Sequence, residues 1–381
     1  MGVWMSSTAQ STTGSSDYAG TGGREPTNIV GIGAVTGYGW GTKHLWDGFL
    51  LGESAVRPVS GLDGYVPGGE AYVALVSDGG DRSDGPSRFM RSVRFTAREA
   101  VTNALDRGWK PGPVVGLVHS LEKGDVEMWS EFYKSGSSRV RPKTWVNMMP
   151  STVLTMVMKE FDFHGPTMSV AAMCASANAG MITAKAWLDS GIASDVILLA
   201  SDLSGIPQHL RAFSDLGASV LNAPAFEACR PFQEGSRGFV GGEAAVGMVL
   251  SGNPTGSYGS VLGGAMTMDA YHLTAVAPDL AELFRCFRLT VRNAGIDPDD
   301  ITYFNAHGPG TSHCDEAEMR VLDELFPAAK GIFSVKPLVG HCQSAAAAVE
   351  TLATLYSFET GFIPAPPKVA PGHPKLLNGT T

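Results

Sequence analysis

Apolar and polar positions follow two patterns along the chain, and together they predict an α/β protein. Short apolar runs bounded by glycine or charged residues predict buried strands, and longer segments with apolar residues at helical spacing predict helices. The expected strands are 28–33, 114–118, 168–173, 195–200, 244–250, 300–304 and 332–335. The expected helices are 86–108, 175–190, 280–294, 315–326 and 343–360. Because strands and helices alternate, we expect α/β layers built around a mostly parallel sheet.

Composition and charge narrow the class of protein. Of the 381 residues 44% are hydrophobic and 17% charged, which suits a large buried core. Residues 1–26 are rich in Ser, Thr and Gly and contain no apolar signal segment, so we expect a disordered N-terminal tail. The net charge of −9 and the lack of any Lys/Arg run argue against nucleic acid and anionic membrane surfaces as partners. Five scattered cysteines without a C-x-x-C pair predict a reduced, cytoplasmic protein.

Cys174 is the first candidate for chemistry. It stands between an apolar strand and an Ala/Ser-rich helix, and a thiol at a helix N-terminus is favoured as the nucleophilic thiolate. His307 and His341 each follow a predicted strand. The carboxyl ends of strands are where open α/β sheets gather their sites, so these three residues predict one site. Glycines beside each histidine would let a substrate approach closely.

The sequence also leaves two alternative kinds of site possible, a dinucleotide site and a zinc site. Gly31-x-Gly33 after the first strand suggests a dinucleotide loop, although Thr36 stands where the third glycine belongs. His307, His313, Cys314 and His341 could bind zinc, although their spacing matches no compact zinc motif.

Six ordered blocks of the sequence resemble the ketosynthases, the decarboxylating condensing enzymes of the thiolase superfamily. These blocks are VGIGAVTGYG, GPTMSVAAMCASANAG, CRPFQEGSRGFVGGEAA, DAYHLTAVAPD, NAHGPGTSHCDEAE and SVKPLVGHCQSAAAA. The similarity is greatest to the elongating enzymes of type II fatty-acid and polyketide synthesis. It implies a thiolase-like α/β fold of duplicated halves in five layers, α-β-α-β-α. The halves would be 27–252, with the nucleophile, and 253–381, with both histidines.

The resemblance also implies roles for individual residues. Cys174 would accept the acyl group, and His307 and His341 would stabilise the enolate formed when a malonyl thioester loses carbon dioxide. Lys336 would order this site, with Glu243 as its acidic partner. The supporting residues would be Thr311 from the first histidine motif, together with Asp315 and Glu318, which would support the loop that carries the first histidine.

The resemblance further implies that no metal or redox cofactor is required. Acyl groups would arrive on an acyl carrier protein or on coenzyme A. The protein would be a homodimer or a heterodimer with a ketosynthase-like subunit.

The sequence departs from the family in three places. Pro309 stands where a threonine is usual, while Thr311 keeps the second threonine of that motif. The blocks 175–178 and 236–239 are also changed. The final strand pair of the family, which carries a second oxyanion-hole N–H and a gating phenylalanine, is not found before Thr381.

These features leave three readings of function. The first is a condensing enzyme that loads Cys174 and extends the acyl group by decarboxylative Claisen chemistry. The second is an acyltransferase that passes the acyl group from Cys174 to an amine, alcohol or thiol. The third is a non-catalytic chain-length or scaffold subunit, a class that tends to have lost the cysteine.

Overall fold

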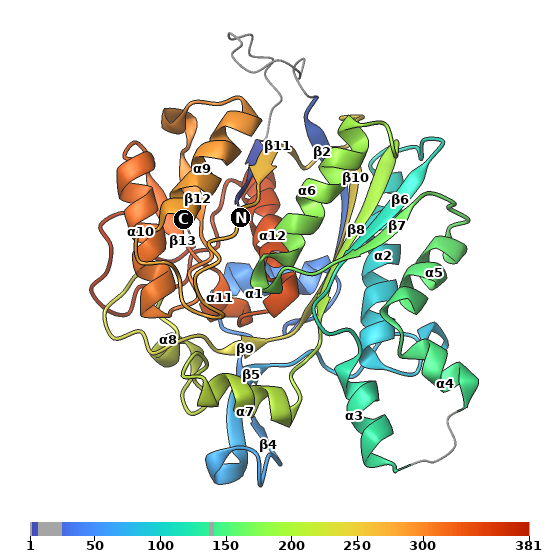
Figure 1. Cartoon of the computed structure of the whole chain (residues 1–381), viewed down its shortest axis with the longest axis horizontal. Coiled ribbons are helices and arrows are strands. Elements are labelled where there is room, and N and C mark those ends of the chain that lie inside the picture. Colours follow the sequence, from blue (N-terminus) through green and yellow to red (C-terminus); the bar gives the residue numbers. More distant parts are fainter. Residues whose placement is uncertain (1, 7–24, 137–140, 381) are drawn as a thin grey trace.

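The computed structural model describes residues 2–6, 25–136 and 141–380, and its elements form five layers (Figure 1). Helices cover both outer faces, and α6 and α12 pack together between two sheets. The strands are β1 Gly2–Ser6, β2 Thr27–Thr36, β3 Gly39–Trp40, β4 Arg57–Ser60, β5 Glu70–Ala74, β6 Val115–Ser120, β7 Thr167–Val170, β8 Asp195–Asp202, β9 Gly241–Gly242, β10 Ala244–Ser251, β11 Gly259–Ala265, β12 Tyr303–Asn305 and β13 Gly331–Phe333. The helices are α1 Thr42–Leu51, α2 Arg88–Asp106, α3 Val126–Lys134, α4 Pro142–Asn147, α5 Pro150–Glu160, α6 Ser176–Asp189, α7 Pro207–Asp215, α8 Ala225–Ala228, α9 Ala281–Ala294, α10 Ser312–Leu325, α11 Lys336–Val339 and α12 Ala346–Thr360.

The largest sheet is mixed rather than mostly parallel. Its order is β1-β11-β2-β10-β8-β6-β7, and only the pairs β8–β6 and β6–β7 are parallel. The expectation of a mostly parallel sheet is therefore wrong. The reason is the long excursion 203–243 after β8, from which the chain returns in the opposite direction as β10.

The glycines of β2 explain why α2 lies so close to the sheet. A Cβ at Gly31 would stand 2.2 Å from the Ala100 carbonyl oxygen, and one at Gly33 would stand 2.3 Å from that of Thr96. Both carbonyls belong to α2, so only glycine permits this approach. The Gly31-x-Gly33 pattern therefore serves helix packing, and the dinucleotide-loop alternative loses its basis.

The second part of the chain builds a smaller sheet with its own helical cover. β12 and β13 pair in parallel, and α9 and α10 pack against each other on the outer side. A separate apolar cluster, which includes Phe304 and Phe326, joins these elements. The apolar side chains of α12 belong instead to the main core between the two sheets.

Part of the expected N-terminal tail is ordered. β1 pairs with β11 in antiparallel register, from Gly2 opposite Ala265 to Ser6 opposite Ser260. The edge of β11 offers unpaired backbone groups, and an added strand satisfies them. The expectation of disorder is wrong for these residues, and 7–24 lie outside the described residues.

Two further properties follow from the described elements. All five cysteines are free thiols. Within the described parts of the chain, no helix combines the length and apolar character needed to cross a membrane.

Candidate active site

Cys174 lies in a single helical turn, η3 (Met173–Ala175), directly before α6. Met173 adopts a positive φ of 51°, which is unusual for a residue with a side chain. The Ser176 hydroxyl holds this turn, because it accepts the Ala172 N–H at 2.8 Å and donates to the Met173 carbonyl at 2.6 Å. The turn therefore presents the Cys174 side chain at the base of the central helix layer.

His341 enters the site from the loop between α11 and η5 (Gln343–Ala345). Gly340 has a φ of 74°, and a Cβ there would lie 2.5 Å from the Gly241 carbonyl oxygen. This glycine thus serves packing of the His341 turn against β9, and the expected role in substrate approach is wrong for it. The His341 Nδ1 accepts the Gln343 N–H at 3.0 Å. In a neutral ring the proton then resides on Nε2, which becomes a donor.

His307 follows β12 and is held by two charged neighbours. The carboxylate of Glu318 accepts the backbone N–H of His307 at 2.7 Å and that of Gly308 at 2.6 Å. The Lys336 ammonium lies 3.4 Å from His307 Nδ1 and also donates to the His307 carbonyl. Because an ammonium only donates, Nδ1 is the acceptor and the ring proton resides on Nε2.

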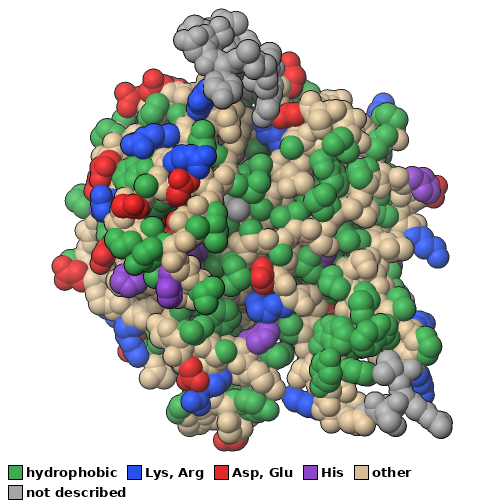
Figure 2. All heavy atoms as spheres, viewed as in Figure 1, with side chains coloured by type: hydrophobic (Ala, Val, Ile, Leu, Met, Phe, Trp, Pro, Cys, Tyr) green, Lys and Arg blue, Asp and Glu red, His purple; other side chains and the backbone are tan. Residues whose placement is uncertain are grey.

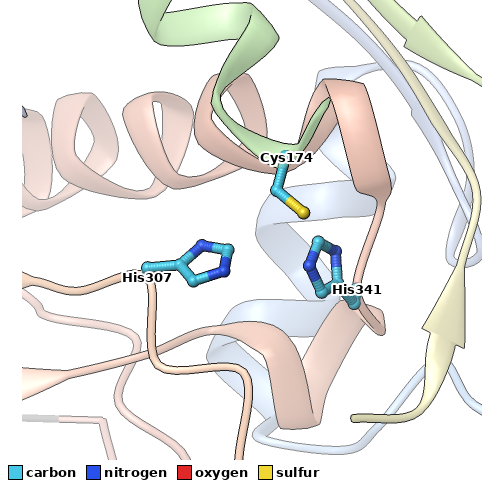
Figure 3. Close-up of side chains that lie close together, drawn as sticks. All are labelled: Cys174, His307 and His341. Carbon is cyan, nitrogen blue, oxygen red and sulfur yellow. The ribbon is translucent and has the colours of Figure 1, made fainter. Parts of the chain in front are cut away.

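The three side chains meet at one point (Figure 3). The Cys174 sulfur and one ring nitrogen of each histidine all lie within 4.8 Å of one another. The two imidazoles stand nearly perpendicular, with ring centroids 5.4 Å apart and an interplanar angle of 79°. The structure therefore brings together the three residues that the sequence marked as one site.

Burial governs the protonation of all three groups. It raises the pKa of Cys174 to about 11, although the positive charge of Lys336 opposes the shift. Burial, assisted by Lys336, lowers the pKa of both His307 and His341 well below the ordinary value. The resting site is therefore a neutral thiol facing two neutral imidazoles. Burial is the largest of the causes that act on the Cys174 pKa, and it works against the thiolate that the helix N-terminus was expected to favour.

Lys336 is the buried charge of the site, and its partner differs from the expected one. Its ammonium pairs with Glu350 of α12. Burial lowers the pKa of Lys336, but the carboxylates of Glu350 and Glu318 together with the Cys174 thiol leave that pKa above its ordinary value. Glu243 instead pairs with Arg88 at 2.9 Å and accepts the N–H groups of Val76 and Gly205. The expected pairing of Glu243 with Lys336 is therefore wrong. One signal could have identified Glu350, since it is the lone carboxylate among the apolar residues that begin helix 343–360.

The remaining predicted residues support the His307 loop. Asp315 accepts the N–H of Phe232 at 3.0 Å and that of Gly310 at 3.1 Å, and burial raises its pKa to about 7. Thr311 is the residue before α10, and its side chain bonds with Cys314. Together with the two bonds of Glu318, these contacts place Asp315 and Glu318 against the backbone of the His307 loop.

The Cys–His–His group also supplies the donor types of a metal site. Among the described residues it is the one group of this kind, and His313 does not take part. The Lys336 ammonium beside His307 Nδ1 places a positive charge next to these donors. That charge opposes a bound cation and favours negative charge on a substrate.

A cavity of about 970 Å³ opens beside this site. Cys174, His307, Glu318 and Glu350 line it, together with apolar and polar side chains that include residues of α9, β12 and α12. A substrate can therefore reach the Cys174 thiol and the His307 imidazole from the same space.

Comparisons with known proteins agree with this geometry. The family model of the beta-ketoacyl synthase N-terminal domain matches residues 24–254, and that of the C-terminal domain matches residues 258–369. The chain is 28% identical to the chloroplastic 3-oxoacyl-[acyl-carrier-protein] synthase I of Hordeum vulgare, over 89% of this chain and 79% of the relative. It is 29% identical to nodulation protein E of Rhizobium meliloti, over 88% of this chain and 87% of the relative.

Solved structures share the fold. A type II polyketide ketosynthase, in complex with its acyl-carrier protein and bound to a hexaketide, matches with a TM-score of 0.79 and 21% identity; the match covers 93% of this chain and 92% of that one. A ketosynthase of Xenorhabdus doucetiae, in complex with its chain length factor, matches with a TM-score of 0.77 and 21% identity, over 93% and 92% of the two chains. The expected thiolase-like fold is confirmed by these neighbours. With both halves matched and the Cys–His–His site assembled, the chain belongs to the beta-ketoacyl synthase family.

Proposed function

We propose that this chain catalyses a decarboxylative Claisen condensation with Cys174 as its acyl carrier. The observation that carries the proposal is the pair of neutral imidazoles, whose Nε2–H donors are free to face a substrate oxygen beside the Cys174 sulfur. Two such donors suit an oxygen on which negative charge develops during the reaction.

The first step is transthioesterification. The Cys174 sulfur attacks the carbonyl carbon of an acyl thioester, and the carrier thiol leaves with the proton that the cysteine gave up. The products are an acyl-cysteine and a free carrier thiol. This covalent step divides one difficult reaction into two easier ones.

The second step uses a malonyl thioester. Its carboxylate leaves as carbon dioxide, and the electron pair forms an enolate whose oxygen accepts the Nε2–H of His307 and of His341. The enolate carbon attacks the acyl-cysteine carbonyl, the C–S bond breaks, and Cys174 takes up a proton. The Lys336 charge, held by Glu350, favours the negative charge of this enolate.

The thioester donors would be an acyl carrier protein or coenzyme A. One solved relative is described in complex with its acyl-carrier protein, which supports the carrier protein as the donor here.

A second subunit would join at the free edge of β7. The carbonyls of Pro166 and Val170 bond to β6, so the backbone groups of Thr167 and Ser169 point outward. Apolar side chains also gather over α3 and α4, and the rings of Trp129 and Trp145 pack together there (Figure 2). An exposed strand edge and an apolar patch both suit a homodimer or a heterodimer with a ketosynthase-like subunit.

Intact-protein mass spectrometry tests the chemistry directly. The protein is incubated with acyl-carrier or acyl-CoA thioesters of increasing length and then with malonyl-carrier. We expect the protein to gain one acyl mass, and the carrier then to gain that acyl group with loss of carbon dioxide. Cys174→Ala should remove the first mass gain, and Cys229→Ala is the matched control at a buried thiol.

The outcomes separate the competing functions. Acylation that malonyl-carrier leaves unchanged would favour the acyltransferase, and amine, alcohol and thiol acceptors would then be compared. Acylation that persists in the Cys174→Ala variant would remove Cys174 from its role. No acylation by any thioester would favour the non-catalytic subunit.

A further inference from the structure

Lys123 carries a positive charge that the chemistry proposed above does not use. It follows β6, and its side chain is only 24% exposed. Its ion-pair partner, Asp202 Oδ2 at the end of β8, lies 3.7 Å away, which is too far for a hydrogen bond. No hydrogen bond joins the ammonium to any residue in the described parts of the chain. Its N–H donors therefore stay unfilled in a largely buried position.

The carboxylate of Asp202 is engaged by other donors. Its Oδ1 accepts the Ser204 N–H at 3.2 Å and also the Ser204 hydroxyl, and its Oδ2 accepts the Ser344 hydroxyl at 3.1 Å. The long pair with Lys123 thus balances charge without filling the donors of the ammonium. An anionic oxygen is the acceptor that a group of this kind binds most strongly.

A series of contacts leads from Cys174 to Lys123 on the His341 side of the site. A ring nitrogen of His341 lies within 4.8 Å of the Cys174 sulfur. Phe239 packs against His341 with ring centroids 4.9 Å apart, and Phe213 packs against Phe239 with centroids 5.7 Å apart. The Lys123 ammonium lies 5.8 Å from the centroid of the Phe213 ring. Aromatic side chains therefore line the way from the thiol to the ammonium.

The backbone closes this circuit of contacts on the other side. Glu122, the residue before Lys123, accepts the N–H of Met173 at 3.1 Å, and Met173 precedes Cys174. On the face shown in Figure 2, acidic, basic and histidine side chains gather in a hollow between the base of α6 and α7. The contacts thus surround a space with the thiol at one end and the ammonium at the other.

Two histidines respond to the charge of Lys123. Burial is the larger cause that lowers the pKa of His209, and Lys123 is the second. For His341, burial and Lys336 come first, and Lys123 lowers the pKa further. The Lys123 ammonium therefore acts through space on a residue that contacts the Cys174 sulfur.

We propose that Lys123 makes the site selective for acyl groups that end in a carboxylate, the half-thioesters of dicarboxylic acids. The thioester carbonyl lies at the Cys174 sulfur, the methylene chain packs against Phe239 and Phe213, and the far carboxylate accepts from the Lys123 ammonium. Loading forms the bond from the Cys174 sulfur to the acyl carbon and breaks the bond to the carrier thiol, which leaves with the cysteine proton. The far carboxylate stays unchanged. This selectivity rests on the acyl loading of Cys174 proposed above.

Binding of matched thioesters tests the selectivity. Succinyl-, glutaryl-, adipoyl- and suberoyl-CoA are each compared with the methyl-ended thioester of equal carbon number, as adipoyl-CoA with hexanoyl-CoA. Calorimetry on the Cys174→Ala protein gives the dissociation constants, because this variant lacks the thiol that would react. At the chain length that spans the two ends of the space, we expect the carboxylate-ended thioester to bind at least tenfold more tightly.

Variants of Lys123 assign the preference to one side chain. Lys123→Met keeps most of the bulk without the charge, and we expect it to remove the tenfold preference. Because this change leaves Asp202 without its counterion, Lys123→Met combined with Asp202→Asn is measured as well and should behave in the same way. Lys110→Met is the matched control, since Lys110 is exposed, and it should keep the preference. Circular dichroism verifies that each variant is folded.

Several results would overturn the proposal. Equal binding of the two kinds of thioester at every length would do so, as would a preference that survives both Lys123 variants. Equal weakening of carboxylate-ended and methyl-ended thioesters in these variants would instead assign the ammonium to the phosphates of coenzyme A. A loss confined to malonyl-CoA would assign it to the carboxylate that leaves as carbon dioxide.

Mass spectrometry of the native chain separates this inference from the proposed function. We expect the carboxylate-ended thioester to load Cys174 faster than its methyl-ended partner. Loading of both at equal rates would contradict the selectivity alone. A lack of loading by any thioester, with the binding preference retained in Cys174→Ala, would contradict the acyl transfer alone.

Discussion

At the scale of single residues, the site depends on two imidazoles that stay neutral. The Nδ1 atom of each ring is engaged, by Lys336 in one case and by the Gln343 N–H in the other. Burial keeps both rings uncharged at neutral pH. Each therefore presents one N–H donor, which is what an oxygen with developing charge needs.

Removing one donor should slow decarboxylation without preventing acyl loading. For His307→Ala or His341→Ala we expect a loss of roughly 10²–10³ in the rate of carbon dioxide release, the usual effect of one oxyanion donor. The rate of carbon dioxide release from malonyl-carrier in a single turnover measures this loss. His313→Ala is the matched control, because His313 is exposed on α10. A normal rate in either site variant would exclude the enolate role for that histidine.

The raised pKa of Cys174 predicts how the thiol reacts with pH. The thiolate fraction grows about tenfold per pH unit below a pKa of about 11. Alkylation by iodoacetamide should therefore accelerate about tenfold per unit from pH 7 to pH 10. Mass spectrometry in a Cys314→Ser background measures the rate at Cys174, because Cys314 lines the same cavity. A plateau between pH 7 and pH 8 would instead indicate a thiolate that is already formed.

At the scale of elements, the Lys336–Glu350 pair joins α11 to α12 beneath the site. Both side chains are largely buried, so loss of one partner leaves an uncompensated charge. This pair also explains why α12 carries a carboxylate in an otherwise apolar turn. The loop of His307 and the helix α12 are thereby held together by one ammonium group.

Glu350→Gln should destabilise the protein by about 3–5 kcal/mol, the usual cost of breaking a buried ion pair. Denaturant unfolding measures the change in free energy. The double variant Lys336→Met with Glu350→Leu should recover most of the stability while the decarboxylation stays slow. Arg320→Gln is the control, since it breaks an exposed pair with Glu324 and should cost less than about 1 kcal/mol. An equal loss of unfolding free energy in Glu350→Gln and Arg320→Gln would contradict a buried, structural Lys336–Glu350 pair.

At the scale of the whole molecule, the strands β12 and β7 differ in what surrounds them. The strand β12 lines the cavity beside Cys174, whereas the edge of β7 faces outward at the end of the largest sheet. Thr167, Met168 and Ser169 of β7 are exposed. An outward edge of this kind pairs readily with another chain.

Ser169→Pro should weaken subunit association. Its N–H points away from β6, so proline removes a bond to a second subunit while sparing the pairing within the chain. Sedimentation velocity across a concentration series should show at least a tenfold weaker dimer. Ser169→Thr keeps the N–H and should associate as the native chain does. Association that is unchanged by proline would place the interface elsewhere.

The sequence alone determined the local elements and the chemistry of the site. Apolar runs and helical spacing predicted β8, β10, α2, α9 and α12 close to their observed bounds. Burial of one or both faces of an element determines which of its positions are apolar. Cys174, His307 and His341 could be grouped into one candidate site because a thiol and imidazoles beside strand ends carry distinctive chemistry. Local propensity and residue type can both be obtained from a short stretch of sequence, without knowledge of the fold.

The tertiary structure decided what depends on distant contacts. The partner of Lys336 is Glu350 rather than Glu243, because the path of the backbone, and not residue type, sets which carboxylate is near. The pKa of Cys174 rises because burial outweighs the opposing charge of Lys336, and burial is a property of the assembled layers. The mixed sheet arises from strand order, which is set by long-range pairing that no local pattern records.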